Sequence, residues 1–390
     1  IRQPVIVVAK DLFPSDTVKM DPKYIKGIIT EEGGVTSHVS IMAKNYGIPV
    51  LTGVSGILDQ VEDGLTICMD AKCGTIVVEP EQAVLEAYER LSEEEAIEQE
   101  NIKKYRALEP VTPQGKRISL CINVGNTEEM KLALDKNVDG VGLFRTEFLY
   151  MENSHFPTEE EQFAVYKEAA TLCPKEVTIR TLDIGGDKSL PYYEFEPEEN
   201  PFLGWRAIRI SLDMPEMFET QLRAILRASV FGHIRIMFPM LISVEELLEA
   251  KQIVAKCKNK LRQEGIPFDE GIEIGMMMET PASVLLAEEF AKEADFFSIG
   301  TNDLTQYILA VDRGNKKIAS RYDSFHPAVW KAIETIIQAG HKYKCKVGMC
   351  GELAGDVAAI PKLLELGLDE FSMSAGTVDY ARRAIIGKVI

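Results

Sequence analysis

The chain has 390 residues, of which 46% are hydrophobic, and a formal net charge of −18 at pH 7. This length predicts one small and one large domain, since single domains usually hold about 100–200 residues and α/β barrels about 250. The negative charge argues against general binding to nucleic acids or anionic membranes, because the long-range field repels both. An anionic small substrate would need a local cluster of arginines.

The seven cysteines are scattered and include no C-x-x-C pair. The sequence therefore predicts neither a disulfide framework nor a zinc site, and we expect a reducing, cytoplasmic location. No apolar run reaches the length of about 18 residues that a membrane span needs. The start, Ile1 to Pro4, does not form a signal peptide, so we expect no membrane insertion and interpret the abrupt opening as a truncation.

Residues 1–80 are expected to form a compact α/β domain. Short β-branched runs bounded by Gly, Pro and Asp predict its strands. These runs are Val5 to Ala9, Ile25 to Thr30, Val50 to Gly53, Leu65 to Asp70 and Thr75 to Glu79. Between the second and third, Ser37 to Tyr46 is predicted to be a helix that begins at a Thr or Ser cap and stops at Gly47. His38 would lie in its first turn.

The stretch from Gly33 to Ser40, GGVTSHVS, is the first candidate site. Phosphorylation of a histidine needs an open imidazole nitrogen, nearby hydroxyl or backbone donors, and small residues that let a second domain approach. The glycine pair supplies clearance, Thr36 and Ser37 supply hydroxyls, and a helix N-terminus favours negative charge. The alternative is a histidine that merely caps the helix. The double glycine makes phosphorylation of His38 the better hypothesis.

Residues 81–112 are predicted to be a helical linker. Glu81 to Leu108 is rich in charged residues, and its apolar residues recur near helical spacing without a strand signal. Pro110 and Pro113 end this pattern.

Residues 113–390 predict a (β/α)8 barrel. Near-continuous apolar runs separated by helical stretches are typical of buried parallel strands. The eight runs are Ile118 to Asn123, Gly140 to Phe144, Val177 to Leu182, Arg235 to Phe238, Ile272 to Met278, Phe296 to Ile299, Lys346 to Met349 and Glu370 to Met373. Catalytic groups of such a barrel lie at the carboxyl ends of its strands, and polar residues follow most of these ends.

Arginines at these ends indicate an anion site. Arg145 and Arg180 end neighbouring strands and offer planar donors that match a phosphate or carboxylate. The alternative is a structural ion pair with Glu147 or Asp183. Arg313, after the sixth strand, could close over the same anion, and Arg206 is a weaker candidate because it could be a packing residue.

Glu279 and Asp303 also follow adjacent strands and are hard oxygen ligands of the kind that Mg²⁺ takes. The alternative is salt bridging to the arginines. We favour a metal, because two carboxylates would otherwise lie beside an anionic ligand.

Cys350 is the one cysteine at a predicted strand end. Its thiol could protonate a carbanion or attack a substrate, and a core position is an equally good alternative.

These residues resemble the bacterial phosphoenolpyruvate-protein phosphotransferase family, enzyme I of the sugar phosphotransferase system. The resemblance covers nearly the whole chain. It is carried by Gly33 to Lys44, Phe144 to Glu147 (FRTE), Arg180 to Lys188 (RTLDIGGDK), Asn200 to Arg206 (NPFLGWR), Met278 to Pro281, Gly300 to Tyr307 (GTNDLTQY), Asp312 to Asn315 and Gly348 to Asp356.

The resemblance implies that phosphoenolpyruvate and Mg²⁺ bind in the barrel and that His38, on a swivelling small domain, takes the phosphoryl group. It implies substrate ligands in Arg145, Arg180, Asn302 and Arg313, metal ligands in Glu279 and Asp303, and a proton donor to the enolate in Cys350, so that pyruvate is released. It further implies a small histidine-containing phosphocarrier protein as the next acceptor in sugar uptake, and a homodimer formed through the barrel.

The sequence departs from the family at several points. The inserted helical domain that binds the carrier is not found, so transfer to the carrier is in doubt. Phe13 stands where the family usually has Thr, and Lys44 replaces the usual Arg.

Two alternative functions remain. A pyruvate phosphate dikinase or phosphoenolpyruvate synthase fragment shares the chemistry, although no trace of an ATP-grasp domain appears. A regulatory module that binds phosphoenolpyruvate would need the arginines but neither His38 nor Cys350.

Overall fold

The computed structural model describes residues 3–12, 21, 23–32, 43, 47–185, 188–315 and 317–388. The chain divides into two compact units, residues 1–105 and 106–390. His38, the rest of the stretch from Gly33 to Ser40, and the departures at Phe13 and Lys44 lie outside the described residues. Their predicted roles therefore stay predictions.

The first unit contains a small parallel sheet of strands β1 (Val5–Ala9), β2 (Ile25–Thr30) and β3 (Val50–Leu51), in the order β1-β2-β3. The central strand is the apolar one, and Ile25, Ile28 and Ile29 are buried. Strands β4 (Ile67–Asp70) and β5 (Thr75–Val78) form an antiparallel pair. All five predicted strands are confirmed. The third is shorter than predicted because Gly53 has a φ of +73°, which takes the chain out of extended geometry.

Helix α3 (Gln82–Lys103) occupies most of the segment expected to be helical. Most of its side chains are exposed, in keeping with its many glutamates. The 3-10 turn η1 (Lys104–Ala107) follows it. No helix of the described residues combines the length and the apolar character needed to cross a membrane.

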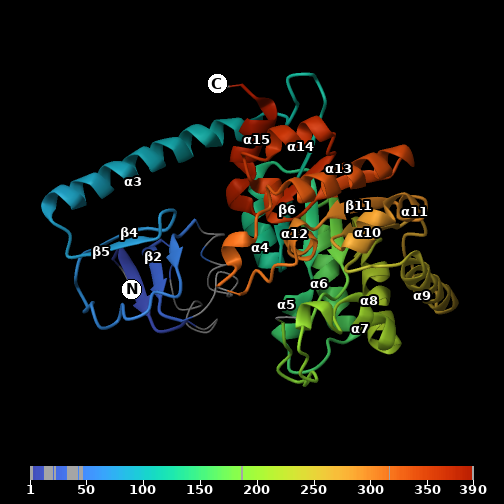
Figure 1. Ribbon diagram of the computed structural model, residues 1–390. Helices are drawn as coiled ribbons and strands as arrows, with labels where there is room; N and C mark the ends of the chain where they lie inside the picture. Colours follow the sequence, from blue (N-terminus) through green and yellow to red (C-terminus); the bar gives the residue numbers. More distant parts are fainter. Residues whose placement is uncertain are drawn as a thin grey trace. The chain divides into compact units, whose positions relative to one another are not determined.

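The second unit is built on a closed barrel of eight parallel strands, as predicted (Figure 1). Neighbouring strands in the sequence are neighbours in the barrel, and β13 pairs with β6 to close it. The strands are β6 (Ser119–Val124), β7 (Gly140–Arg145), β8 (Glu176–Arg180), β9 (His233–Phe238), β10 (Glu273–Met278), β11 (Phe296–Ile299), β12 (Lys346–Met349) and β13 (Glu370–Met373).

Helices follow the strands and cover the barrel, and the main apolar core lies between the two layers. The helices are α4 (Thr127–Ala133), α5 (Glu147–Met151), α6 (Glu159–Leu172), α7 (Ile208–Asp213), α8 (Pro215–Ala228), α9 (Val244–Gln263), α10 (Pro281–Leu285), α11 (Ala287–Ala291), α12 (Thr301–Leu309), α13 (Pro327–Lys342), α14 (Ile360–Leu366) and α15 (Val378–Ile386). For the site, the important ones are α5 and α12, which begin directly after strands β7 and β11, and the 3-10 turns η3 (Pro201–Leu203) and η5 (Glu352–Gly355).

Candidate active site at the barrel mouth

Most predicted site residues lie at the carboxyl ends of the barrel strands. Arg145 and Arg180 are the last residues of β7 and β8 and pair with each other in the strand register. Glu279 directly follows β10 and Cys350 directly follows β12, while Asn302 and Asp303 lie in the first turn of α12. The parallel barrel thus brings to one rim residues as far apart in the sequence as Arg145 and Cys350.

Arg180 is buried between two carboxylates. It forms an ion pair with Glu147, at the start of α5, and its Nη1 lies 3.1 Å from Oδ2 of Asp183. Lys188 joins the same group, with its Nζ 2.8 Å from Oε1 of Glu147 and 3.5 Å from Oδ2 of Asp183. Burial alone would raise the pKa of Asp183, but the nearby Lys188, Arg180 and Arg206 hold it well below its usual range. Asp183 is therefore ionised at neutral pH.

Arg145 differs from its neighbour on β8. It is half-buried, and within the described part of the chain neither Glu147 nor Asp183 forms an ion pair with it. Of the two arginines expected either to bind an anion or to form a structural pair, Arg180 makes the pairs. Arg145 makes neither of these pairs, and its role as an anion ligand stays a prediction.

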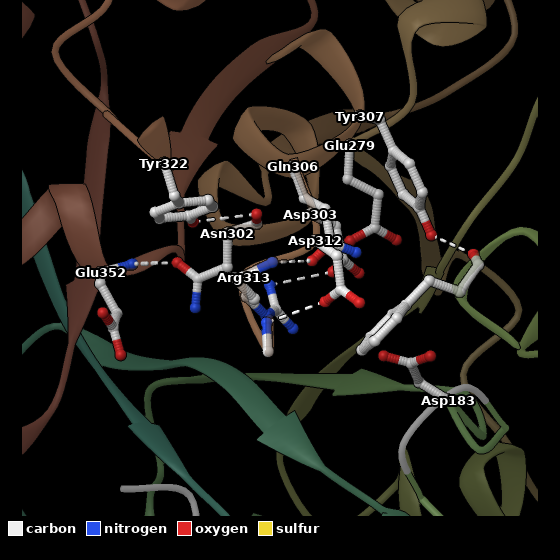
Figure 2. A network of polar contacts seen from close by, with 12 residues as sticks. Asp183, Glu279, Asn302, Asp303, Gln306, Tyr307, Asp312, Arg313, Tyr322 and Glu352 are labelled. Atoms are coloured by element: carbon white, nitrogen blue, oxygen red, sulfur yellow. Dashed lines mark hydrogen bonds and ion pairs between the residues drawn. The ribbon is translucent and has the colours of Figure 1, made fainter. Parts of the chain in front are cut away.

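Arg206 and Arg313 meet at one carboxylate, although both lie on loops rather than at strand ends. Nη2 of Arg206 lies 3.0 Å from Oδ1 of Asp183 and 3.2 Å from Oδ2 of Asp303. Nη1 of Arg313 lies 3.1 Å from the other oxygen, Oδ1, of Asp303. Figure 2 shows Arg313 beside Asp303, with Glu279 above and to the right of them. Arg206, which the sequence made the weaker candidate, is thus part of this cluster of charged side chains.

Glu279 is almost completely buried in this cluster. Its Oε1 accepts a hydrogen bond of 2.7 Å from the backbone N–H of Met240. Met240 itself has a φ of +60°, an unfavourable conformation for a non-glycine residue, so local strain accompanies this contact. Burial raises the pKa of Glu279 to about 8, helped by the negative charges of Asp303 and Asp183.

The donor set at Glu279 and Asp303 fits a hard divalent cation. A cation beside the buried Glu279 would offset the cost of its negative charge, and Mg²⁺ usually takes one or two carboxylates together with water and substrate oxygens. Both oxygens of Asp303 already contact arginines, so a cation would share this carboxylate with them. The assignment of Glu279 and Asp303 as metal ligands stays a prediction.

A second group with metal-ligand chemistry lies elsewhere among the described residues. The ligand atoms of Glu176, His233 and Glu273 lie within 4.8 Å of one another. These residues begin strands β8, β9 and β10, so they lie at the amino end of the barrel, opposite the arginines. They do not belong to the mouth.

Cys350 lies inside the barrel with Leu143, Met237, Met277 and Phe296. Its backbone N–H donates to the carbonyl of Ile299 at 3.1 Å. Burial raises the pKa of its thiol to about 11, and a hydrogen bond with Ser298 and the charge of Arg180 offset only part of this effect. The thiol is therefore protonated at neutral pH. A protonated thiol is not a nucleophile, and its apolar neighbours also suit the core position that the sequence left open, so the role of Cys350 stays a prediction.

Sequence reasoning missed three members of the mouth. Lys188 was noted only as part of a family motif. Its position shortly after a strand end and a glycine pair is itself a signal for a basic residue at the barrel mouth. Tyr307 hydrogen-bonds to Arg206 at 3.2 Å, and the ring of Phe202 lies 5.8 Å from Cζ of Arg206. No periodicity or spacing in the sequence points to these two aromatic residues.

Comparison with known proteins decides the family. The domain family described as "PEP-utilising enzyme, PEP-binding domain" matches residues 99–388, and the one described as "PEP-utilising enzyme, mobile domain" matches residues 1–74. A phosphoenolpyruvate-protein phosphotransferase of Priestia megaterium is 47% identical over 386 residues, which are 99% of this chain and 67% of that protein. The chain belongs to the phosphoenolpyruvate-protein phosphotransferase family, a family of enzymes.

A second relative in this phosphotransferase family comes from Staphylococcus carnosus (strain TM300). It is 44% identical over 386 residues, again 99% of this chain and 67% of the relative. The chain thus spans about two thirds of the length of these relatives. Among solved structures, a citrate lyase from Burkholderia xenovorans LB400 has a TM-score of 0.44 at 17% identity, over 70% of this chain and 80% of that one. This similarity is too low to bear on function.

Proposed function

We propose that the chain transfers the phosphoryl group of phosphoenolpyruvate to His38 in a Mg²⁺-dependent reaction that releases pyruvate. The observation that carries this proposal is the mouth itself, where Arg180, Arg206 and Arg313 pair with buried carboxylates at the carboxyl end of a barrel and Arg145 ends the strand next to Arg180. The membership in the phosphotransferase family supports the choice of substrate.

The charges of the described mouth support a trianionic substrate bound together with a divalent cation. Five basic groups face four carboxyl groups, namely Arg145, Arg180, Lys188, Arg206 and Arg313 against Glu147, Asp183, Glu279 and Asp303. A cation bound at Glu279 would keep this carboxyl ionised; the nine groups then carry one positive charge in excess, and the divalent cation brings the excess to three. Fully ionised phosphoenolpyruvate carries three negative charges, so the filled site would be neutral, which a buried site requires.

In the proposed reaction, Arg145, Arg180, Arg313 and the side-chain amide of Asn302 bind and orient the anion. A ring nitrogen of His38 attacks phosphorus, the phosphorus–oxygen bond to the enol breaks, and its electron pair stays on the enolate. A divalent cation held by Glu279 and Asp303 would supply positive charge that stabilises the enolate. The Cys350 thiol then gives its proton to the enolate carbon, which yields pyruvate and a thiolate that regains its proton from solvent.

The fate of the phosphoryl group forms a finer part of the proposal. We propose a small histidine-containing phosphocarrier protein as the acceptor from His38 in sugar uptake, and a homodimer that forms through the barrel. We place the reaction in the cytoplasm. The free state of all seven cysteines, six of them buried, supports a reducing compartment.

The test is incubation with phosphorus-labelled phosphoenolpyruvate and Mg²⁺. We expect an acid-labile, base-stable protein phosphate that is absent from His38→Ala. Persistent labelling in this variant would reject His38 as the acceptor. Phosphorylation of pyruvate that requires ATP would favour the dikinase or synthase alternative, and binding of phosphoenolpyruvate without labelling would favour a regulatory module.

A further inference from the structure

Arg206 is held through two different nitrogens. Its Nη2 donates to Asp183 and Asp303, and its Nη1 donates to the hydroxyl of Tyr307 at 3.2 Å. The side chain is almost completely buried. The two contacts at Nη2 restrict the guanidinium plane, and the Tyr307 contact adds a second nitrogen to the set that orients it.

The hydroxyl of Tyr307 has a single possible arrangement of donors. It contacts Arg206 and also the backbone carbonyl of Phe202. A carbonyl only accepts and a guanidinium only donates, so the hydroxyl proton must point to Phe202 while Arg206 donates to the hydroxyl oxygen. Burial raises the pKa of Tyr307 to about 12, so this proton is present at neutral pH. Figure 2 shows the hydroxyl at the right of the network, with a dashed line to a backbone oxygen.

Two of the groups that contact the Arg206 guanidinium come from one face of helix α12. Asp303 and Tyr307 both belong to α12 and are four residues apart, which places them on the same side of the helix. Phe202 and Arg206 in turn belong to one connection, residues 200–206, which contains η3 and leads to α7. Through its hydrogen bonds with the Arg206 side chain and the Phe202 carbonyl, Tyr307 therefore holds two residues of this connection against α12.

The same contact places an aromatic ring beside the arginines. The ring centre of Phe202 lies 5.8 Å from Cζ of Arg206 and 5.7 Å from Cζ of Arg313. Both distances allow a cation–π attraction. Because Tyr307 holds the backbone of Phe202, it also holds this ring between two arginines that share Asp303.

We propose that Tyr307 is a positioning residue that holds the 200–206 connection against α12 and thereby sets the affinity of the mouth for its anionic substrate, rather than the rate of the chemical step. This inference rests on the proposed function for the identity of the substrate. The Tyr307 hydroxyl would not contact the substrate itself, and would act on substrate binding through Arg206 and Phe202.

The experiment compares Tyr307→Phe with Tyr192→Phe in single-turnover labelling by phosphoenolpyruvate. Tyr192 is a matched control, because its hydroxyl also donates to a backbone carbonyl, that of Tyr150 at 2.8 Å, but contacts no arginine among the described residues. For Tyr307→Phe we expect the half-saturating substrate concentration to rise about tenfold, the size expected for losing a hydrogen bond to a charged group, while the maximal rate changes less than about twofold. Tyr192→Phe should leave both values unchanged.

A double-mutant comparison separates positioning from a general loss of stability. In an Arg206→Lys background, Tyr307→Phe should raise the half-saturating concentration by less than about twofold, because the group that it positions is already altered. Phe202→Leu, which keeps the backbone carbonyl, serves as a second variant and should also raise this concentration at an unchanged maximal rate.

Three results would overturn the inference. The first is a half-saturating concentration in Tyr307→Phe equal to that in Tyr192→Phe. The second is a Tyr307→Phe variant in which only the maximal rate falls. The third is full additivity of the Tyr307→Phe and Arg206→Lys effects on the half-saturating concentration. Failure of the proposed function is distinguishable, since the wild-type chain itself would then take up no label.

Discussion

The backbone N–H of Glu352 donates a hydrogen bond of 3.0 Å to Oδ1 of Asn302. This contact joins the loop that follows Cys350 to the first turn of α12, which carries Asp303 (Figure 2). Because a backbone N–H can only donate, the oxygen of the Asn302 amide must face Glu352, and its NH₂ group is left to donate elsewhere. The proposed proton donor and the proposed anion-binding amide are therefore fixed relative to each other.

Gly351 makes this close approach possible. A Cβ at this position would lie 1.9 Å from Oγ1 and 2.5 Å from the backbone nitrogen of Thr301. We expect Gly351→Ala to push the loop from α12, to lower the free energy of unfolding by about 1–3 kcal/mol and to slow labelling. Gly271→Ala is the matched control, because its Cβ would meet only an oxygen of Asp269 at 3.5 Å. Urea unfolding checks the prediction, and equal stability of the two variants would contradict it.

Arg180→Lys should lose activity although it keeps the charge. A lysine cannot reach Glu147, Asp183 and a bound anion at once from a single nitrogen, whereas the guanidinium fork can. We expect the labelling efficiency to fall by about a hundredfold, or about 2.7 kcal/mol. The control is Arg117→Lys, an arginine that pairs with Asp139 at the other end of the barrel strands. A loss of less than about threefold in Arg180→Lys would show that the fork is not needed.

Glu279→Gln tests the metal assignment. Removal of one carboxylate charge should weaken the binding of Mn²⁺, used as a probe for Mg²⁺, by at least about tenfold. The fold should persist, because the neutral amide suits a site where burial raises the pKa of the native side chain to about 8. Electron paramagnetic resonance of free Mn²⁺ measures the affinity. The exposed Glu288, paired with Lys342 at 2.6 Å, gives the control Glu288→Gln. Equal affinities in both variants would remove Glu279 from the ligand set.

The Cys350 thiol should respond to pH in the alkaline range only. An ordinary thiol has a pKa of 9.0, whereas that of Cys350 is about 11, so between these values the folded chain keeps a proton that the unfolded chain has lost. The free energy of unfolding should therefore fall as pH rises through this window, and the fall should be smaller in Cys350→Ala. Urea unfolding of both proteins at several pH values measures the difference. A rise of stability through the window would contradict the assigned burial of the thiol.

Cys350→Ala should separate substrate binding from proton transfer. The arginines and Asn302 are unchanged in this variant, so we expect the half-saturating concentration of phosphoenolpyruvate to stay within about twofold. Release of pyruvate should slow by about a hundredfold or more, the usual contribution of a positioned acid. Rapid-quench measurement of pyruvate gives this rate. Unchanged release would return Cys350 to the role of a core residue.

The barrel could be predicted from the sequence because buried parallel strands are continuous apolar runs. The runs at Phe296 to Ile299, Lys346 to Met349 and Glu370 to Met373 coincide with β11, β12 and β13. Once the strands are placed, their ends identify Arg145, Glu279 and Cys350 without further information. A strand end is a local feature, and local patterns determine it.

The pairing within the mouth could not be predicted in the same way. Arg180 rather than Arg145 binds Glu147 and Asp183, a choice made by side-chain packing that no spacing encodes. The Arg206–Tyr307 contact joins residues 101 positions apart, one on the irregular connection before α7 and the other on helix α12. Such contacts depend on loop paths, which apolar periodicity does not describe.

The most direct test of the central claim is to locate the phosphate after one turnover. The wild-type chain is mixed with phosphoenolpyruvate and Mg²⁺, quenched under alkaline conditions and digested, and the peptides are examined by mass spectrometry. We expect one phosphoryl group per chain, on the peptide that contains His38, and one equivalent of pyruvate. Phosphate on any other peptide, or release of pyruvate from His38→Ala at the wild-type rate, would contradict the claim that His38 is the acceptor.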